Sequence, residues 1–400
     1  MPPTAADVSV SAGMIWHARQ LLRAGGLAIG WPPFGLSLIA VCLFFTGAGT
    51  IDWLFGGDQA DRLWPQLITP FTVAVDNEPL RTQISWQSPR VEAVLHTAAY
   101  PWSSLVTPLE EIVWGDARTT LAPPASAASF LSQLLQVAWA LACWSLLGTA
   151  MCRSVAVMLA KDRSESFREA VQFAWPRWPS TIGAPAIPVG AILAIAVGLI
   201  VTAWFGRLPW IGTSLLTLAS PLLLLAGLAI AFLALVIIGG WPLMVAAMGV
   251  EDCDGFGALS RSYSFLTGRP LRAVANVVLS ALIGGVLVAL VGGWLTFGLL
   301  AEANFLRASI GTPERWLTVM QWSHFFAVGL LLTFAANLFW SLATLNYLLL
   351  RQEVDSKPFD DIAAGPSDPS FHRDLPIVGI PATDYRPPTA VEQPLHSTAP

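Results

Sequence analysis

Few residues of this chain have the type and spacing that catalysis or metal binding would need. Glu110 and Glu111 are adjacent acids, and paired carboxylates can exchange protons with a substrate. His96 and His324 are candidate metal ligands, but neither has a second ligand at metal-binding spacing. No Ser-His-Asp order, phosphate-binding glycine loop or zinc motif accompanies them, so we interpret the two acids as solvated side chains and assign no metal site to the histidines. The sequence therefore predicts a protein that is not an enzyme and that uses no cofactor or metal.

Three arginines form the first candidate binding site. Arg261 lies within the connector between two long apolar segments, and Arg269 and Arg272 lie at its end. Asp254 is a suitable N-cap for a short helix in this connector, so we expect a helix lying on the membrane surface. Its arginines could then contact lipid phosphate groups. The alternative for Arg261 is a side chain that extends to the headgroups without recognising them, or that caps a neighbouring helix.

Amide side chains inside the apolar segments form the second candidate site. Gln136, Asn276 and Asn337 each lie within such a segment, where ionisable residues are nearly absent. Ion-coupled transporters usually need ionisable groups at mid-depth in the membrane, so their scarcity argues against that class. Amides in membrane helices mostly form hydrogen bonds between helices, and the alternative is a substrate site built from the three.

The segments that hold these residues are long enough to cross a membrane. The chain is 54% hydrophobic and 12% charged, with a mean hydropathy of +0.61. A helix of about 20 apolar residues spans a bilayer, and a membrane chain must satisfy its backbone hydrogen bonds internally. The sequence therefore predicts an all-α, polytopic membrane protein with six transmembrane helices. The predicted spans are Phe34–Leu54, Phe130–Met151, Pro185–Phe205, Leu222–Met248, Ala273–Leu300 and Phe325–Leu350.

Lysine and arginine set the expected orientation. The short segments that hold Arg19, Arg153, Arg261 and Arg351 are richer in basic residues than the opposite loops, which places them and both termini in the cytoplasm. We expect a multi-pass protein of a bacterial cytoplasmic (inner) membrane. A net charge of −5 with no basic stripe argues against a nucleic-acid partner, which leaves the lipid bilayer and other membrane proteins.

Composition divides the chain into three parts. Residues 1–31 form a cytoplasmic amphipathic segment, and residues 32–351 form the membrane domain. Within that domain, residues 55–129 are rich in proline and tryptophan and are expected to form a cap on the outer membrane surface. Residues 352–400 hold many prolines and acids with few apolar residues, which predicts a disordered cytoplasmic tail.

The membrane domain also shows an internal repeat. The order of interfacial helix, span, outer turn and returning span occurs in residues 153–250 and again in 251–351, and residues 10–152 resemble a third copy. This pattern predicts three helical hairpins in pseudo-repeat. Two spans carry small residues at four-residue spacing, where close helix packing is expected unless glycine and alanine are simply common there. These are Gly190, Ala194 and Gly198 on one span and Gly285, Ala289 and Gly293 on the other.

Several motifs resemble an uncharacterised family of bacterial polytopic membrane proteins with six spans. The motifs are Trp241–Met244, Glu251–Asp254, Ala258–Phe265, Arg269-Pro270 and the closing Leu345–Arg351. The Ala-Leu-x-Arg-Ser core is more distantly similar to membrane domains associated with glycerophosphodiester phosphodiesterases. In those relatives catalysis belongs to a separate soluble domain, for which this chain has no room, so the resemblance implies a membrane fold without that activity.

These observations favour an integral membrane protein that scaffolds or assists a membrane assembly. The alternative is a permease or flippase-like carrier for an apolar or lipid substrate, which would not need charges inside the membrane. A cavity lined by Gln136, Asn276 and Asn337 would favour the carrier, and a solidly packed bundle would favour the scaffold.

Overall fold

The computed structural model describes residues 5–55, 73–75, 84–86, 91–105, 127–208, 211–309 and 313–365. Over these ranges the chain is an all-α protein with six helices long and apolar enough to cross a membrane, as the sequence predicts. The strands described are β1 (Val73–Val75) and β2 (Ile84–Trp86), which pair antiparallel with Val73 opposite Trp86. The protein is therefore a multi-pass helical membrane protein.

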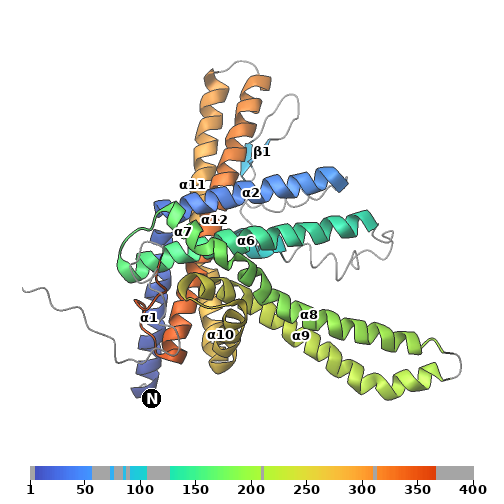
Figure 1. Cartoon of the computed structure of the whole chain (residues 1–400). Helices are drawn as coiled ribbons and strands as arrows, with labels where there is room; N and C mark the ends of the chain where they lie inside the picture. The colour runs from blue at the N-terminus through green and yellow to red at the C-terminus, as the bar shows by residue number, and fades with distance from the viewer. Residues whose placement is uncertain are drawn as a thin grey trace, which may run out of the picture. The chain divides into compact units, whose positions relative to one another are not determined.

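The six long helices form three hairpins (Figure 1). They are α2 (Trp31–Phe55) with α6 (Ala127–Lys161), α8 (Trp178–Phe205) with α9 (Gly212–Val250), and α11 (Pro270–Ser309) with α12 (Pro313–Asp355). A shorter helix precedes each hairpin: α1 (Ala5–Leu27), α7 (Phe167–Ala174) and α10 (Gly255–Gly268). The order matches the predicted pattern, whereas the internal repeat itself stays a prediction.

Local capping signals define the short helices. The Ser166 hydroxyl accepts a hydrogen bond from the Glu169 backbone, and the Glu169 carboxylate accepts one from the Ser166 backbone, which begins α7. Asp254 Oδ1 accepts a hydrogen bond of 2.7 Å from the Gly257 N–H and begins α10. On α10, Phe265 is buried against the protein and Phe256 is exposed, so the helix has one face toward the protein and another available to lipid.

Three tryptophans form the centre of the packed core. Trp144 of α6, Trp241 of α9 and Trp340 of α12 are almost completely buried, one from each hairpin. The ring centroids of Trp241 and Trp340 are 5.4 Å apart, and those of Trp144 and Trp340 are 6.5 Å apart. Large aromatic side chains contribute much of the burial energy of a core, so this cluster holds the three hairpins together.

Part of the region between α2 and α6 enters this core. Helix α4 (Val91–Ala98) packs on α11 and α12, and a further helical stretch covers residues 100–105. Tyr100 is 1% exposed and contacts Phe44 and Trp144 edge to face. The prediction that residues 55–129 form a cap on the outer surface is therefore wrong for residues 91–105. Most of the remainder lies outside the described residues.

The two stripes of small residues have opposite environments. On α8, Gly190, Ala194 and Gly198 are exposed, and a Cβ on either glycine would meet nothing within 4 Å. The prediction that this stripe packs against protein is wrong within this chain. The half-buried residues of α8 lie on the opposite helix face, where larger side chains pack. These are Ile192, Ile195, Ala196 and Leu199.

The stripe on α11 lies closer to protein. Gly285 is buried, and Ala289 and Gly293 are half-buried. A Cβ on Gly285 would lie 3.3 Å from Leu95 Cδ2 of α4. Gly285 therefore permits α4 to approach α11, which is the role that its spacing predicts.

Gly285→Leu is expected to lower the free energy of unfolding in detergent by about 1–3 kcal/mol, because the larger side chain overpacks the contact with α4. Gly190→Leu is the matched control, since its Cβ meets nothing, and it should change stability by less than about 0.5 kcal/mol. Thermal unfolding measures both. Equal effects of the two substitutions would contradict the packing of α4 on Gly285.

The end of the sixth helix also differs from the prediction. Helix α12 continues to Asp355, and residues as far as Ala363 belong to the same compact unit as the membrane helices. The prediction of a disordered tail from residue 352 is therefore wrong for residues 352–363. Residues 366–400 lie outside the described residues.

Candidate functional site

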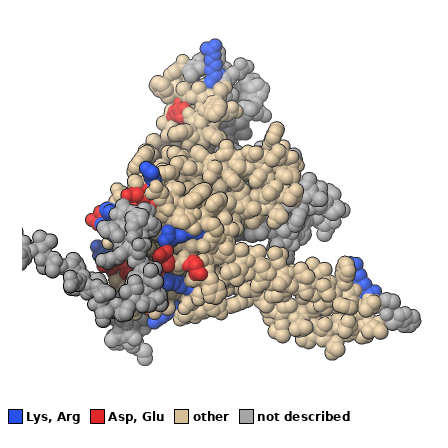
Figure 2. All heavy atoms as spheres, viewed as in Figure 1, with Lys and Arg blue, Asp and Glu red and all other residues tan. Residues whose placement is uncertain are grey.

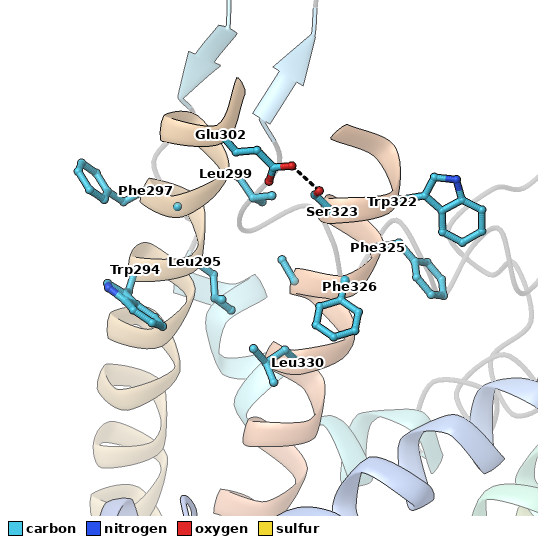
Figure 3. Close-up of a pocket in the computed structure, with 12 residues that line it drawn as sticks. Trp294, Leu295, Phe297, Leu299, Glu302, Trp322, Ser323, Phe325, Phe326 and Leu330 are labelled. Carbon is cyan, nitrogen blue, oxygen red and sulfur yellow. Dashed lines mark hydrogen bonds between the residues drawn. The ribbon is translucent and has the colours of Figure 1, made fainter. Parts of the chain in front are cut away.

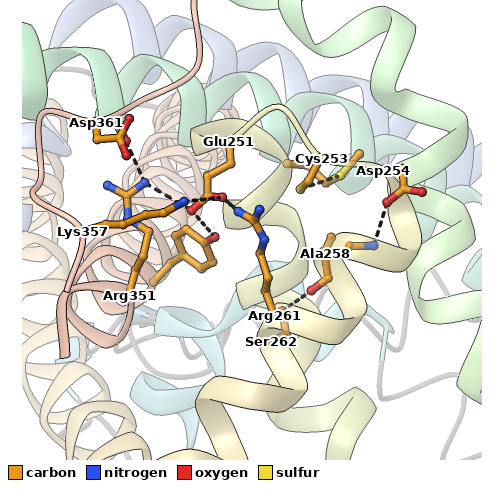
Figure 4. A network of polar contacts seen from close by, with 12 residues as sticks. Glu251, Cys253, Asp254, Ala258, Arg261, Ser262, Arg351, Lys357 and Asp361 are labelled. Atoms are coloured by element: carbon orange, nitrogen blue, oxygen red, sulfur yellow. Dashed lines mark hydrogen bonds and ion pairs between the residues drawn. The ribbon is translucent and has the colours of Figure 1, made fainter. Parts of the chain in front are cut away.

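The carboxylate of Glu251, at the end of α9, is the centre of a polar network (Figure 4). Its Oε1 accepts hydrogen bonds from the Tyr347 hydroxyl at 2.9 Å and from Arg351 Nη1 at 3.2 Å. Its Oε2 pairs with Arg261 of α10 and lies 3.9 Å from Lys357 Nζ. Glu251 and Arg351 are both buried. One acid therefore connects α9, α10 and α12 near the ends of α9 and α12.

Arg351 also holds the segment that follows α12, residues 356–363, which we call the strap. Its Nη1 donates a hydrogen bond of 2.7 Å to the Asp361 carbonyl, and its Nη2 donates one of 2.7 Å to the Pro358 carbonyl. Hydrogen bonds from a charged donor are the stronger class in proteins. The strap is thus fixed to the helix from which it emerges.

The end of the strap is fixed to two other helices. Arg153 Nη1 of α6 donates a hydrogen bond of 2.7 Å to the Ala363 carbonyl. The Ala363 N–H donates one of 2.8 Å to the Val250 carbonyl, at the end of α9. The strap therefore connects the ends of α6, α9 and α12, one helix from each hairpin.

Arg153 forms a second buried ion pair. Its Nε lies 3.4 Å from Glu165 Oε2, both side chains are fully buried, and its guanidinium lies 4.4 Å from the centre of the Phe173 ring. Burial raises the pKa of the Glu165 carboxyl above its ordinary value, and the charge of Arg153 acts in the opposite direction. The pair holds the connector before α7 against α6.

A third polar cluster attaches helix α1. The His17 Nε2 lies 3.1 Å from Glu353 Oε1 of α12, and its Nδ1 lies 3.2 Å from Asn276 Oδ1 of α11. Glu353 also pairs with Arg272. His17 is buried, so this contact fixes the N-terminal helix to the third hairpin.

The structure distributes the three predicted amides among different contacts. Asn276 contacts His17, Gln136 Nε2 donates a hydrogen bond of 2.7 Å to Asp52 Oδ1, and Asn337 Nδ2 donates one of 2.7 Å to the Ala28 carbonyl. Asn276 and Gln136 each join two helices, and Asn337 joins α12 to the residue after α1, which is the role that amides in membrane helices mostly have. These contacts give no support to a single substrate site built from the three.

The three arginines predicted to contact lipid also have different environments. Arg261 pairs with Glu251 and Arg272 pairs with Glu353, so both take part in contacts within the chain. Arg269 is exposed at the C-terminus of α10. A lipid contact by these arginines stays a prediction.

Sequence reasoning missed the acids and the central arginines of these clusters. In the sequence, Glu251 is the first charged residue after a long apolar segment. Arg153 and Arg351 are charged residues at the ends of two other apolar segments. Charges in such places are often paired when the helix ends pack together, which is a usable signal.

The contacts of the Glu251 network join different segments of the chain. Burial raises the pKa of the Cys253 thiol to about 11, which keeps this nearby sulfur protonated and weakly nucleophilic at neutral pH. Over the ranges that the structure describes, no three His, Cys, Asp or Glu side chains are placed to hold a metal ion. The arrangement is suited to joining the helix ends.

No family model matches the chain, and neither a curated protein nor a solved structure matches it. The resemblance given by the sequence motifs therefore stays a prediction.

A chain ending at Asp355 is expected to be less stable by at least about 2 kcal/mol than one ending at Gly365, because only the longer chain keeps the strap and its hydrogen bonds to charged donors. The chain ending at Gly365 should unfold at nearly the full-length temperature, because residues 366–400 have few apolar side chains. Thermal unfolding in detergent compares the three lengths. Identical transitions would show that the strap contributes nothing to stability.

Proposed function

We propose that this integral membrane protein scaffolds or assists an assembly of other membrane components. The observation that supports this proposal is the packing where the hairpins meet, in which Trp144, Trp241 and Trp340 are buried together. A carrier needs two arrangements of its helices around a central site. A dense aromatic core reinforced by the Glu251 network favours one arrangement. A rigid junction of the three hairpins suits a protein that presents helices to other membrane proteins.

The second candidate is a carrier for an apolar or lipid substrate. One observation favours it, an apolar crevice between α11 and α12. This crevice lies apart from the tryptophan core, so a carrier would have to use the third hairpin alone.

Two measurements on the tagged protein separate these candidates. For a scaffold, the same membrane protein should copurify from native membranes in two different mild detergents, and tagging that partner should recover this chain. Vesicles reconstituted with the purified chain should then show no faster movement of fluorescent lipid between leaflets than empty vesicles. Purification of the chain alone, together with accelerated lipid movement, would reject the scaffold in favour of the carrier.

We also propose that the strap and α1 face the cytoplasm of a bacterium. Figure 2 shows most of the basic and acidic side chains gathered where the described helices converge, and long uncharged surfaces lead from there to a few charged side chains at the tips. The cytoplasmic ends of membrane helices carry an excess of lysine and arginine. The basic residues at this end include Arg153, Arg177, Arg261, Arg272 and Arg351.

Cysteine labelling tests this orientation. In a background without the four native cysteines, Ser88→Cys should react with an impermeant thiol reagent in cells whose outer membrane has been permeabilised. Ser356→Cys, at an exposed position of the strap, should react only after the inner membrane is broken. The reverse pattern would invert the proposed topology.

A further inference from the structure

A crevice lies between helices α11 and α12, and the two helices pack on each other on both sides of it along their length. Nearer the tryptophan core they pack through residues such as Val288 and Leu331, and nearer the hairpin tip through Ala303 and Met320. The crevice between these contacts has a volume of about 710 Å³. Figure 3 shows Leu295, Phe326 and Leu330 directed into the space between the helices.

The crevice has one charged group. Glu302 lines it at the end nearer the hairpin tip, and its carboxylate accepts a hydrogen bond of 2.6 Å from the Ser323 hydroxyl. Most of the other lining side chains are aliphatic or aromatic. The volume falls within the range of about 300–1,000 Å³ that small-molecule sites occupy. An apolar chain with a positive group at one end would complement both parts of the surface.

The position of the crevice along α11 and α12 indicates which leaflet of the bilayer it faces. At about 1.5 Å per residue, Leu295 lies about 35 Å along α11 from Arg272, and Glu302 about 45 Å. On α12, Leu330 lies about 32 Å from Arg351, and Ser323 about 42 Å. The hydrocarbon layer is about 30 Å thick, and about 40–45 Å with the headgroups. The crevice therefore extends from the far edge of the hydrocarbon toward the far headgroups, and Glu302 lies at headgroup level.

We propose that this crevice binds one phospholipid of the leaflet opposite the Arg272 and Arg351 end, and that Glu302 selects a headgroup with a primary ammonium. The upper part of one acyl chain fills the apolar space, because water would find few polar partners there. The ammonium pairs with the Glu302 carboxylate in a charge-assisted hydrogen bond. The exposed Trp294 and Trp322 lie at the level where tryptophan favours the membrane interface. This site does not depend on the proposed scaffold function.

Titration of the delipidated protein in detergent tests the site. Native mass spectrometry would measure the binding of dioleoyl phosphatidylethanolamine and of dioleoyl phosphatidylglycerol, which share their chains and differ in headgroup charge. We expect the ethanolamine lipid to bind about tenfold more tightly. Glu302→Gln can keep the hydrogen bond to Ser323 and removes the charge, so it should abolish the preference between the two lipids.

Filling the crevice provides the second test. Gly298 lines it, and a Cβ there would meet nothing within 4 Å, so Gly298→Leu adds volume without a clash and should weaken both lipids about tenfold. Gly293→Leu on the same helix also meets nothing and is not among the lining residues, so it should bind like the wild type. Leucine favours a helix more than glycine does, so both variants should fold.

Three results would overturn the proposal. They are equal binding of the two lipids by the wild type, tighter binding of the phosphatidylglycerol, and wild-type binding by Gly298→Leu. Loss of the headgroup preference in Glu302→Gln together with loss of affinity in Gly298→Leu would establish both parts of the site.

Discussion

Glu251→Ala is expected to lower the free energy of unfolding by about 3–5 kcal/mol, because it leaves the buried guanidinium of Arg351 without its acid. The Tyr347 hydroxyl loses its acceptor, and Arg261 loses the partner that joins α10 to the network. Thermal or denaturant unfolding of the detergent-extracted protein would measure the loss. A large effect would show that the ends of α9, α10 and α12 are held by charge as well as by the aromatic core.

Asp252→Ala is the control for this experiment. Asp252 is the next residue, and its side chain is 80% exposed while it pairs with Arg177. An exposed ion pair of this kind contributes about 0–1 kcal/mol, so the control should be mild. If the two substitutions have equal effects, Glu251 is not the centre of a stabilising network.

Arg153→Met is expected to have an effect of similar size, about 3–5 kcal/mol, because it leaves Glu165 buried without a cation and removes the hydrogen bond to Ala363. The double variant Arg153→Met, Glu165→Leu should recover much of the loss, since it removes both buried charges. A double-mutant cycle measures the coupling, and no recovery in the double variant would mean that the contact with Ala363 is the larger contribution.

The pH dependence of the Arg153→Met variant follows from the Glu165 carboxyl. Burial raises its folded pKa above the unfolded value of about 4.3, so the folded state holds a proton that the unfolded state releases. The stability from that proton is present below the unfolded pKa and is lost as pH rises toward the folded pKa. Without Arg153 the pKa rises further, so the stability of the variant should fall more steeply than that of the wild type as pH rises above the unfolded pKa.

The features predicted correctly from the sequence are those that neighbouring residues determine. The N-cap at Asp254 depends on a contact with a residue three positions later, so its chemistry is visible locally. The six long helices follow from composition over about 20 residues each.

The features missed depend on contacts between distant residues. Glu251 and Arg351 are 100 residues apart in the sequence, and Arg153 and Ala363 are 210 residues apart, so no local sequence pattern predicts either contact. Gly190 and Gly285 have the same spacing of small neighbours, yet one is exposed and the other contacts α4. Helix periodicity places such residues on one face, and only the arrangement of the other helices decides whether that face meets protein.

The strap also has a consequence for the order in which the chain is assembled. Arg153 emerges from the ribosome 210 residues before the carbonyl that it binds. At about 5–20 residues per second, roughly 10–40 s separate the two events. During that interval all three hairpins can enter the bilayer before Ala363 forms its hydrogen bonds to Arg153 of α6 and Val250 of α9. The strap therefore completes the fold only after the last membrane helix has been translated, and the three hairpins can adjust to one another before it closes.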